Sequence, residues 1–162
     1  MLRALGSRLL VASRPAAYRS FQQSLRPVPR FFIHKMSTKT PINSPKLSSA
    51  GPYNQAIKAN GVIYCSGQIP VANGKVIEGT VGDQTRQCLL NLQEVLTEAG
   101  SSLNKIVKVN IFLADMDDFA AVNKVYTEVL PDPKPARSCV AVKTVPLSTQ
   151  GVKIEIECIA LE

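Results

Sequence analysis

Apolar and polar residues alternate along several short stretches of this chain, and alternation with a period of two predicts β-strands. Residues 55–59 and 62–69 flank Asn60-Gly61, a dipeptide that favours a two-residue hairpin turn. Ala72-Asn73-Gly74 predicts a second turn. The remaining strands are expected at 106–113, 138–143 and 153–161.

Two longer segments repeat their apolar residues at helical spacing instead. The first spans 82–99, with Gly100 as the stop, and the second follows Asp115, a suitable N-cap, and ends before a run of prolines. The first buried stripe is expected to contain Cys88, Leu89, Leu92, Val95, Leu96 and Ala99, and the second Phe119, Val122, Tyr126 and Val129.

The order of these elements, β-β-α-β-α-β-β, predicts an α+β fold in which a mixed sheet carries both helices on one face. One strand has a wholly apolar face, formed by Val107, Val109, Ile111 and Leu113. A second apolar row should meet the helices: Ile154, Ile156, Cys158 and Ala160. The opposite face carries Glu155, Glu157, Ile159 and Leu161. That face is neither clearly polar nor covered by the chain, so we expect it to be buried against other subunits.

Charge divides the chain into two unequal parts. The formal net charge is +7, from 19 basic and 12 acidic residues, but residues 1–35 hold seven basic side chains and no acidic one. The rest is formally neutral, with 12 of each sign (19 − 7 = 12). A basic, acid-free N-terminus with spaced Leu and Phe predicts a mitochondrial transit peptide over 1–35, and hence a matrix protein. A disordered basic tail is the alternative.

The N-terminus leaves a second question open at Met36. Translation from Met36 would give a cytoplasmic form without the leader; alternatively, Met36 is an ordinary internal methionine. No apolar run is long enough to span a membrane, so no membrane association is expected. We expect an irregular arm over 36–52 and a single domain over 53–162.

The residue types that are missing restrict the chemistry. His34, in the predicted leader, is the sole histidine, and the four cysteines form no CxxC pair. A mature chain without histidine has no Ser-His-Asp triad and no histidine-ligated zinc, so neither a metal nor a cofactor is expected.

Arg137 and Glu155 are charged residues within otherwise apolar strands. A fixed guanidinium binds a carboxylate in bidentate fashion, and a carboxylate can deprotonate water. Together they predict hydrolysis of a small carboxylate-bearing substrate, with Arg137 favouring the ionised form of Glu155. The alternative is a structural ion pair across two strands.

Five ordered motifs between about residue 45 and residue 162 resemble the Rid family (YjgF-type, reactive intermediate deaminase), and the leader resembles that of fungal mitochondrial members. The motifs are Gly51-Pro52-Tyr53-Asn54-Gln55-Ala56, Ser66-Gly67-Gln68-Ile69-Pro70, Asp118-Phe119-Ala120-Ala121-Val122-Asn123, Pro135-Ala136-Arg137-Ser138-Cys139-Val140 and Ile154-Glu155-Ile156-Glu157.

This resemblance implies a homotrimer of chorismate-mutase-like α+β subunits with clefts at the subunit interfaces. It implies hydrolysis of 2-iminobutanoate and 2-iminopropanoate to 2-keto acids and ammonia. Such activity would protect isoleucine and other branched-chain amino-acid synthesis and, indirectly, the mitochondrial genome. By the same resemblance, Arg137 clamps the substrate carboxylate and Glu155 positions water. Substrate-binding residues are then Tyr53, Ser66, Gly67, Asn123 and Cys139.

Each of these binding residues also has a purely structural interpretation. Tyr53 would plug an interface, Ser66-Gly67 would mark a bulge, and Asn123 would bond to backbone. Cys139 is interpreted as a pocket wall, since the mature chain has no histidine to activate it. Glu157 shares the face of Glu155, and only the family motif favours Glu155 as the base.

Two other functions stay open. One is RNA binding or ribonuclease activity. The argument against it is that the mature chain is formally neutral and lacks the excess of basic residues that nucleic-acid affinity needs. The other is a non-catalytic, ligand-binding trimer. The argument against it is that Arg137 and Glu155 are both present, which favours catalysis.

Overall fold

A computed structural model of the chain describes residues 38–49 and 51–162, so the leader predicted over 1–35 and Met36 lie outside the described residues. The main sheet has six strands in the order β1-β2-β3-β8-β6-β7. β6 and β7 are parallel and every other pair is antiparallel. These strands are β1 (Thr40–Ile42), β2 (Ala56–Ala59), β3 (Val62–Gln68), β6 (Ile106–Leu113), β7 (Ala136–Ala141) and β8 (Ile154–Leu161).

Both predicted tight turns are present. Asn60 and Gly61 have φ of 54° and 79° between β2 and β3, and Asn73 and Gly74 have φ of 52° and 76° between the short strands β4 (Val71–Ala72) and β5 (Lys75–Val76). Positive φ at both central residues is the requirement of a type I′ hairpin, which Asn-Gly satisfies at little steric cost.

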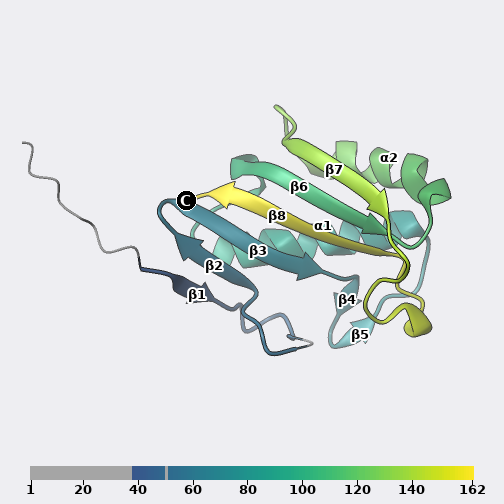
Figure 1. The fold of residues 1–162 in the computed structure, drawn as a ribbon, viewed down its shortest axis with the longest axis horizontal. Helices are drawn as coiled ribbons and strands as arrows, with labels where there is room; N and C mark the ends of the chain where they lie inside the picture. The colour runs from purple at the N-terminus through teal and green to yellow at the C-terminus, as the bar shows by residue number, and fades with distance from the viewer. Residues whose placement is uncertain (1–37, 50) are drawn as a thin grey trace, which may run out of the picture. The chain divides into compact units, whose positions relative to one another are not determined.

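Two helices, α1 (Val81–Glu98) and α2 (Phe119–Val129), cover one face of the sheet, as predicted (Figure 1). The core lies between them and the strands. The row Ile154, Ile156, Cys158 and Ala160 is at most 2% exposed, and Leu89, Leu92, Val95 and Leu96 of α1 are 0% exposed. The α+β prediction is therefore confirmed.

Four local predictions need correction. Residues 36–52 are not wholly irregular, because β1 pairs with β2 there. A register shift in β6 turns Val107 outward, 44% exposed, and buries Ile106 in its place. Asp115 caps a 3₁₀ turn (Met116–Asp118), and α2 begins after it. β7 begins two residues before the predicted 138, since Ala136 already pairs with Lys108 of β6.

The sheet face away from the helices keeps large apolar side chains in contact with solvent. Tyr64, Val140 and Leu161 are each 48–50% exposed there. Among the described residues, no helix has both the length and the apolarity required to cross a membrane.

Candidate functional site

The strand register places Arg137 and Glu155 on opposite faces of the sheet. Arg137 pairs with Val109 of β6, and Val109 with Cys158, both buried beneath the helices. Glu155 instead pairs with Phe112, which lies three residues after Val109 on β6 and therefore points to the opposite face. Residues directly opposite each other in a sheet point to the same side. Arg137 therefore faces α2, and Glu155 faces the side without helices.

The alternative interpretation of Arg137 and Glu155, a structural ion pair across two strands, is therefore wrong within one subunit. Among the described residues, the salt bridges do not include Arg137 or Glu155. Nor does Arg137 favour the ionised form of Glu155 in the same chain. The pKa of the Glu155 carboxyl is raised from its ordinary value, chiefly by burial and then by the negative charge of Glu157.

Arg137 is held in place by α2. Its Nη1 donates a hydrogen bond of 2.6 Å to Oδ1 of Asn123. The guanidinium carbon lies 4.8 Å from the ring centroid of Tyr126 and 5.4 Å from that of Phe119. Its other N–H groups have no hydrogen-bond partner among the described residues, so a planar donor fork is available to a carboxylate.

Cys139 lies two residues further along β7, on the same face as Arg137. It is half-buried and packs against the core. Burial raises the pKa of its thiol, with the nearby Arg137 charge opposing the shift. A thiol with a raised pKa is a weak nucleophile, so Cys139 has the properties of a pocket wall.

The other four predicted residues lie together on the opposite face. Tyr53, Ser66, Gly67 and Glu155 line one cavity of about 440 Å³, which Ile69, Pro146 and Glu157 complete. Ser66 Oγ donates to the carbonyl of Asn54 at 2.7 Å. This hydrogen bond connects the segment that carries Tyr53 to β3. The Tyr53 side chain is 45% exposed.

Gly67 lies directly beside the candidate base. A Cβ built on Gly67 would come within 2.6 Å of Cδ of Glu155 and would overlap its carboxylate. The backbone can therefore approach Glu155 only because residue 67 has no side chain. This contact supports the interpretation of Gly67 as part of the site, beside its role in the bulge of β3.

Glu155 and Glu157 differ in their partners. Asn110 Nδ2 donates to Oε1 of Glu157 at 2.8 Å, whereas Glu155 has no hydrogen-bonded partner among the described residues. A carboxylate without a fixed donor, with its pKa raised by burial, is the better general base.

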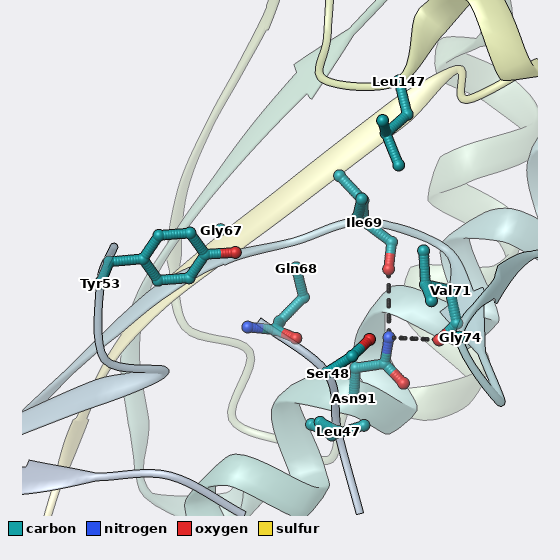
Figure 2. Close-up of a pocket in the computed structure, with 10 residues that line it drawn as sticks. All are labelled: Leu47, Ser48, Tyr53, Gly67, Gln68, Ile69, Val71, Gly74, Asn91 and Leu147. Atoms are coloured by element: carbon teal, nitrogen blue, oxygen red, sulfur yellow. Dashed lines mark hydrogen bonds between the residues drawn. The ribbon is translucent and has the colours of Figure 1, made fainter. Parts of the chain in front are cut away.

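A second, smaller cavity of about 150 Å³ adjoins the first at Tyr53, Gly67 and Ile69 (Figure 2). The described residues of its lining include no carboxylate or guanidinium, and Asn91 beneath it donates to the carbonyls of Ile69 and Val71, each at 3.1 Å. Since the amide of Asn91 is already engaged within the chain, the larger cavity is the better candidate for the functional site.

The seven predicted residues thus form two groups on one subunit. One group comprises Asn123, Arg137 and Cys139 beside α2; the other comprises Tyr53, Ser66, Gly67 and Glu155 on the far face. Sequence reasoning missed Phe119 and Tyr126 as neighbours of Arg137. Their spacing from Asn123 along the helix, four and three residues, was the available signal.

Comparison with known families matches residues 43–162 to the family described as endoribonuclease L-PSP. The chain is 62% identical over 125 residues to Protein mmf2, mitochondrial, of Schizosaccharomyces pombe. The aligned region covers 77% of this chain and 99% of that relative. It is 44% identical over 115 residues to Reactive Intermediate Deaminase A, chloroplastic, of Arabidopsis thaliana, covering 70% of this chain and 60% of the relative.

Solved structures show the same likeness. Yeast Mmf1 superimposes with a TM-score of 0.71 at 46% identity, covering 77% of this chain and 99% of that chain. TdcF from E. coli with bound serine gives a TM-score of 0.69 at 35% identity, covering 76% and 98%.

Proposed function

This chain belongs to the endoribonuclease L-PSP family, also called Rid or YjgF, and from that premise we propose that it hydrolyses short 2-imino acids. The substrates are 2-iminobutanoate and 2-iminopropanoate, and the products are the 2-keto acids and ammonia. The observation that carries the proposal is the pair of complementary half-sites. Within the described part of the chain, one offers a fixed guanidinium without a carboxylate partner, and the other a half-buried carboxylate without a cationic partner.

The two half-sites require a second subunit to meet. Since they lie on opposite faces of one sheet, Arg137 of one subunit is proposed to face Glu155 of its neighbour in a homotrimer. The exposed apolar residues Tyr64, Val140 and Leu161 support burial of that face. A cyclic trimer repeats one heterologous contact three times and so makes three such clefts.

The chemistry needs few groups. Arg137 binds the substrate carboxylate, and Glu155 takes a proton from water as the water oxygen bonds to C2 of the protonated imine. Glu155 then returns this proton to the nitrogen of the carbinolamine. The C–N bond breaks, ammonia leaves with the electron pair of that bond, and the hydroxyl proton passes to Glu155 as the ketone forms.

Features of relatives support parts of this proposal. One relative is named a reactive intermediate deaminase, and TdcF was solved with serine, a small molecule that carries a carboxylate. Two fungal relatives are named mitochondrial. We therefore place this protein in the mitochondrial matrix after removal of residues 1–35, where it would protect branched-chain amino-acid synthesis and, indirectly, the mitochondrial genome.

The ribonuclease alternative has less support. Lys105 and Lys108, the cations that would test it, are both engaged within the chain. Nζ of Lys105 donates to the carbonyl of Glu162 at 2.7 Å, and Nζ of Lys108 to Oγ of Ser138 at 2.8 Å. Loss of RNA binding in Lys105→Ala/Lys108→Ala, with imine hydrolysis intact, would restore this alternative.

The test generates 2-iminobutanoate from threonine with a dehydratase and follows the release of 2-ketobutanoate. The purified protein should accelerate release, and Arg137→Ala should abolish most of the acceleration while the protein stays assembled. Loss of the charged contact should cost on the order of 2–5 kcal/mol of transition-state binding. Wild-type turnover in Arg137→Ala, or a defect that comes only from misassembly, would disprove the clamp.

A further inference from the structure

Tyr126 carries a polar atom that the fold does not use. The residue is 5% exposed, and among the described residues its hydroxyl is the buried side-chain polar atom that has no hydrogen-bond partner. Burial raises the pKa of this phenol. Buried hydroxyl groups usually have a hydrogen-bond partner, and this one has none among the described residues. The hydroxyl therefore does not explain why a tyrosine occupies this position. The ring must be considered separately.

The ring of Tyr126 lies against the guanidinium of Arg137. Its centroid is 4.8 Å from the guanidinium carbon, the ring of Phe119 is at 5.4 Å, and Asn123 accepts from Nη1. Residues 119, 123 and 126 follow one stripe of α2 at intervals of four and three. Three successive contacts from one helix therefore bear on a single cation, and two of them are aromatic.

Arg137 needs such support because of where it lies. β7 is the last strand of the sheet, and a long, half-buried arginine side chain at an edge has many rotamers. Bidentate binding of a carboxylate requires the guanidinium to keep one plane. A hydrogen bond from one nitrogen leaves rotation about that contact, whereas flanking aromatic rings restrict it.

We propose that Tyr126 is a positioning residue for Arg137: its ring, together with that of Phe119, fixes the plane of the guanidinium that receives the substrate carboxylate. This inference rests on the proposed function for the identity of the ligand. The positioning itself concerns contacts within one chain, so it can be tested without turnover.

The direct test is the Nε–Hε signal of Arg137 in the NMR spectrum of the full-length protein, assigned by its absence in Arg137→Ala. Ring currents from two flanking aromatic residues should displace this signal from the arginine random-coil position. Tyr126→Leu should return it toward that position, and Tyr126→Phe should leave most of the displacement. An unmoved signal in Tyr126→Leu would overturn the proposal.

The kinetic test separates positioning from stability. Tyr126→Leu should raise KM for 2-iminobutanoate about tenfold or more and change kcat less, because a carboxylate contact acts in the ground state and the transition state alike. Tyr126→Phe should restore most of the loss. Val125→Ala is the matched control, since Val125 is 8% exposed on the same helix and faces α1 beside Gly82.

Three results would overturn the assignment. They are equal KM defects in Tyr126→Leu and Val125→Ala, an equal defect in Tyr126→Phe, or a wild-type KM in Tyr126→Leu. If the wild-type protein fails to hydrolyse imines, the proposed function fails, and the NMR signal of Arg137 still decides whether Tyr126 positions it.

Discussion

At the scale of single residues, Glu155 is the proposed general base, and its ionised form is destabilised by folding. Its pKa is raised above the ordinary 4.5, first by burial and then by Glu157. A raised pKa in the folded state means that the carboxyl contributes stability below 4.5 and loses that contribution as pH rises through the folded value. Glu155→Gln should therefore be no less stable than wild type at neutral pH, while its turnover falls.

The pH dependence of activity tests the same carboxyl. Glu155 must be ionised to accept a proton, so kcat/KM should fall as the pH drops through the pKa of its carboxyl in the assembled site. Glu157→Gln removes the neighbouring negative charge and should move this acid limb to lower pH with activity retained. If the acid limb of the kcat/KM profile stays at the same pH in Glu157→Gln, a group other than Glu155 is responsible for it. Activity lost in Glu157→Gln and kept in Glu155→Gln would transfer the role of base to Glu157.

Gly67→Ala tests the approach of the backbone to Glu155. Gly67 does not have a left-handed φ, so the substitution acts through the contact of Cβ with the carboxylate, at 2.6 Å from Cδ. Glu155 must turn away, and a displacement of about 1 Å can cost on the order of 100-fold in turnover. Gly82→Ala, whose Cβ would meet its neighbours at 3.4 Å, is the control and should keep wild-type turnover. Unchanged turnover in Gly67→Ala would contradict the assignment of Glu155.

At the scale of elements, α1 supports the sheet from the face opposite to Glu155. It begins with a capping box, in which Asp83 N donates to Thr80 Oγ1 at 3.2 Å and Thr80 N to Asp83 Oδ2 at 2.8 Å. Thr80→Ala should lower the free energy of unfolding by about 1 kcal/mol and leave kcat/KM unchanged. Chemical denaturation with parallel assays checks both results.

The effect of Thr80→Ala should also depend on pH. Hydrogen bonds from Thr80 lower the pKa of Asp83 below its ordinary 3.8. A lowered pKa contributes stability above the ordinary value and loses it as pH falls through the folded value. The stability difference between the variant and wild type should therefore be largest near neutral pH and shrink below pH 3.8. A stability difference that does not change with pH would show that the Asp83 carboxylate does not contribute to the cap.

At the scale of the whole molecule, the separation of the two half-sites predicts complementation between inactive subunits. Arg137→Ala subunits keep the Glu155 half, and Tyr53→Ala subunits keep the Arg137 half. Random 1:1 mixing and reassembly should restore roughly one quarter of the clefts in a trimer. Activity that stays at the level of the separate variants, or a stable and active wild-type monomer in sedimentation, would contradict the shared cleft.

The leader makes a prediction about location. Residues 1–35 are basic and acid-free, so deletion of residues 2–30 should abolish delivery to the matrix, and fractionation of cells that express each form measures this. Met36→Leu tests the second start: loss of a cytoplasmic pool would establish it, and an unchanged pool would eliminate it. Matrix delivery that survives the deletion would disprove the transit peptide.

The sequence by itself determined the features that depend on local chemistry and on period. Asn-Gly turns require positive φ, Gly100 ends α1, and the alternation in β8 assigns each side chain to a face, because a strand has a period of two. The helices and strands that were predicted accordingly lie within a few residues of their predicted bounds, whereas the short strands β1, β4 and β5 were not predicted. Among the candidate site residues, Arg137 and Glu155 could be chosen because they are charged residues within apolar strands, whereas the others were chosen from the resemblance of their motifs to a family.

Tertiary structure decided what depends on pairing between distant segments. Whether Arg137 meets Glu155 is set by the register of β7 and β8 on β6, which no local pattern encodes. The shift that exposes Val107 and the pairing that orders β1 also come from neighbouring strands. The contact of Tyr126 with Arg137 arises because the connection from β6 returns α2 beneath β7. A strand period assigns faces, but only packing decides which faces and residues meet.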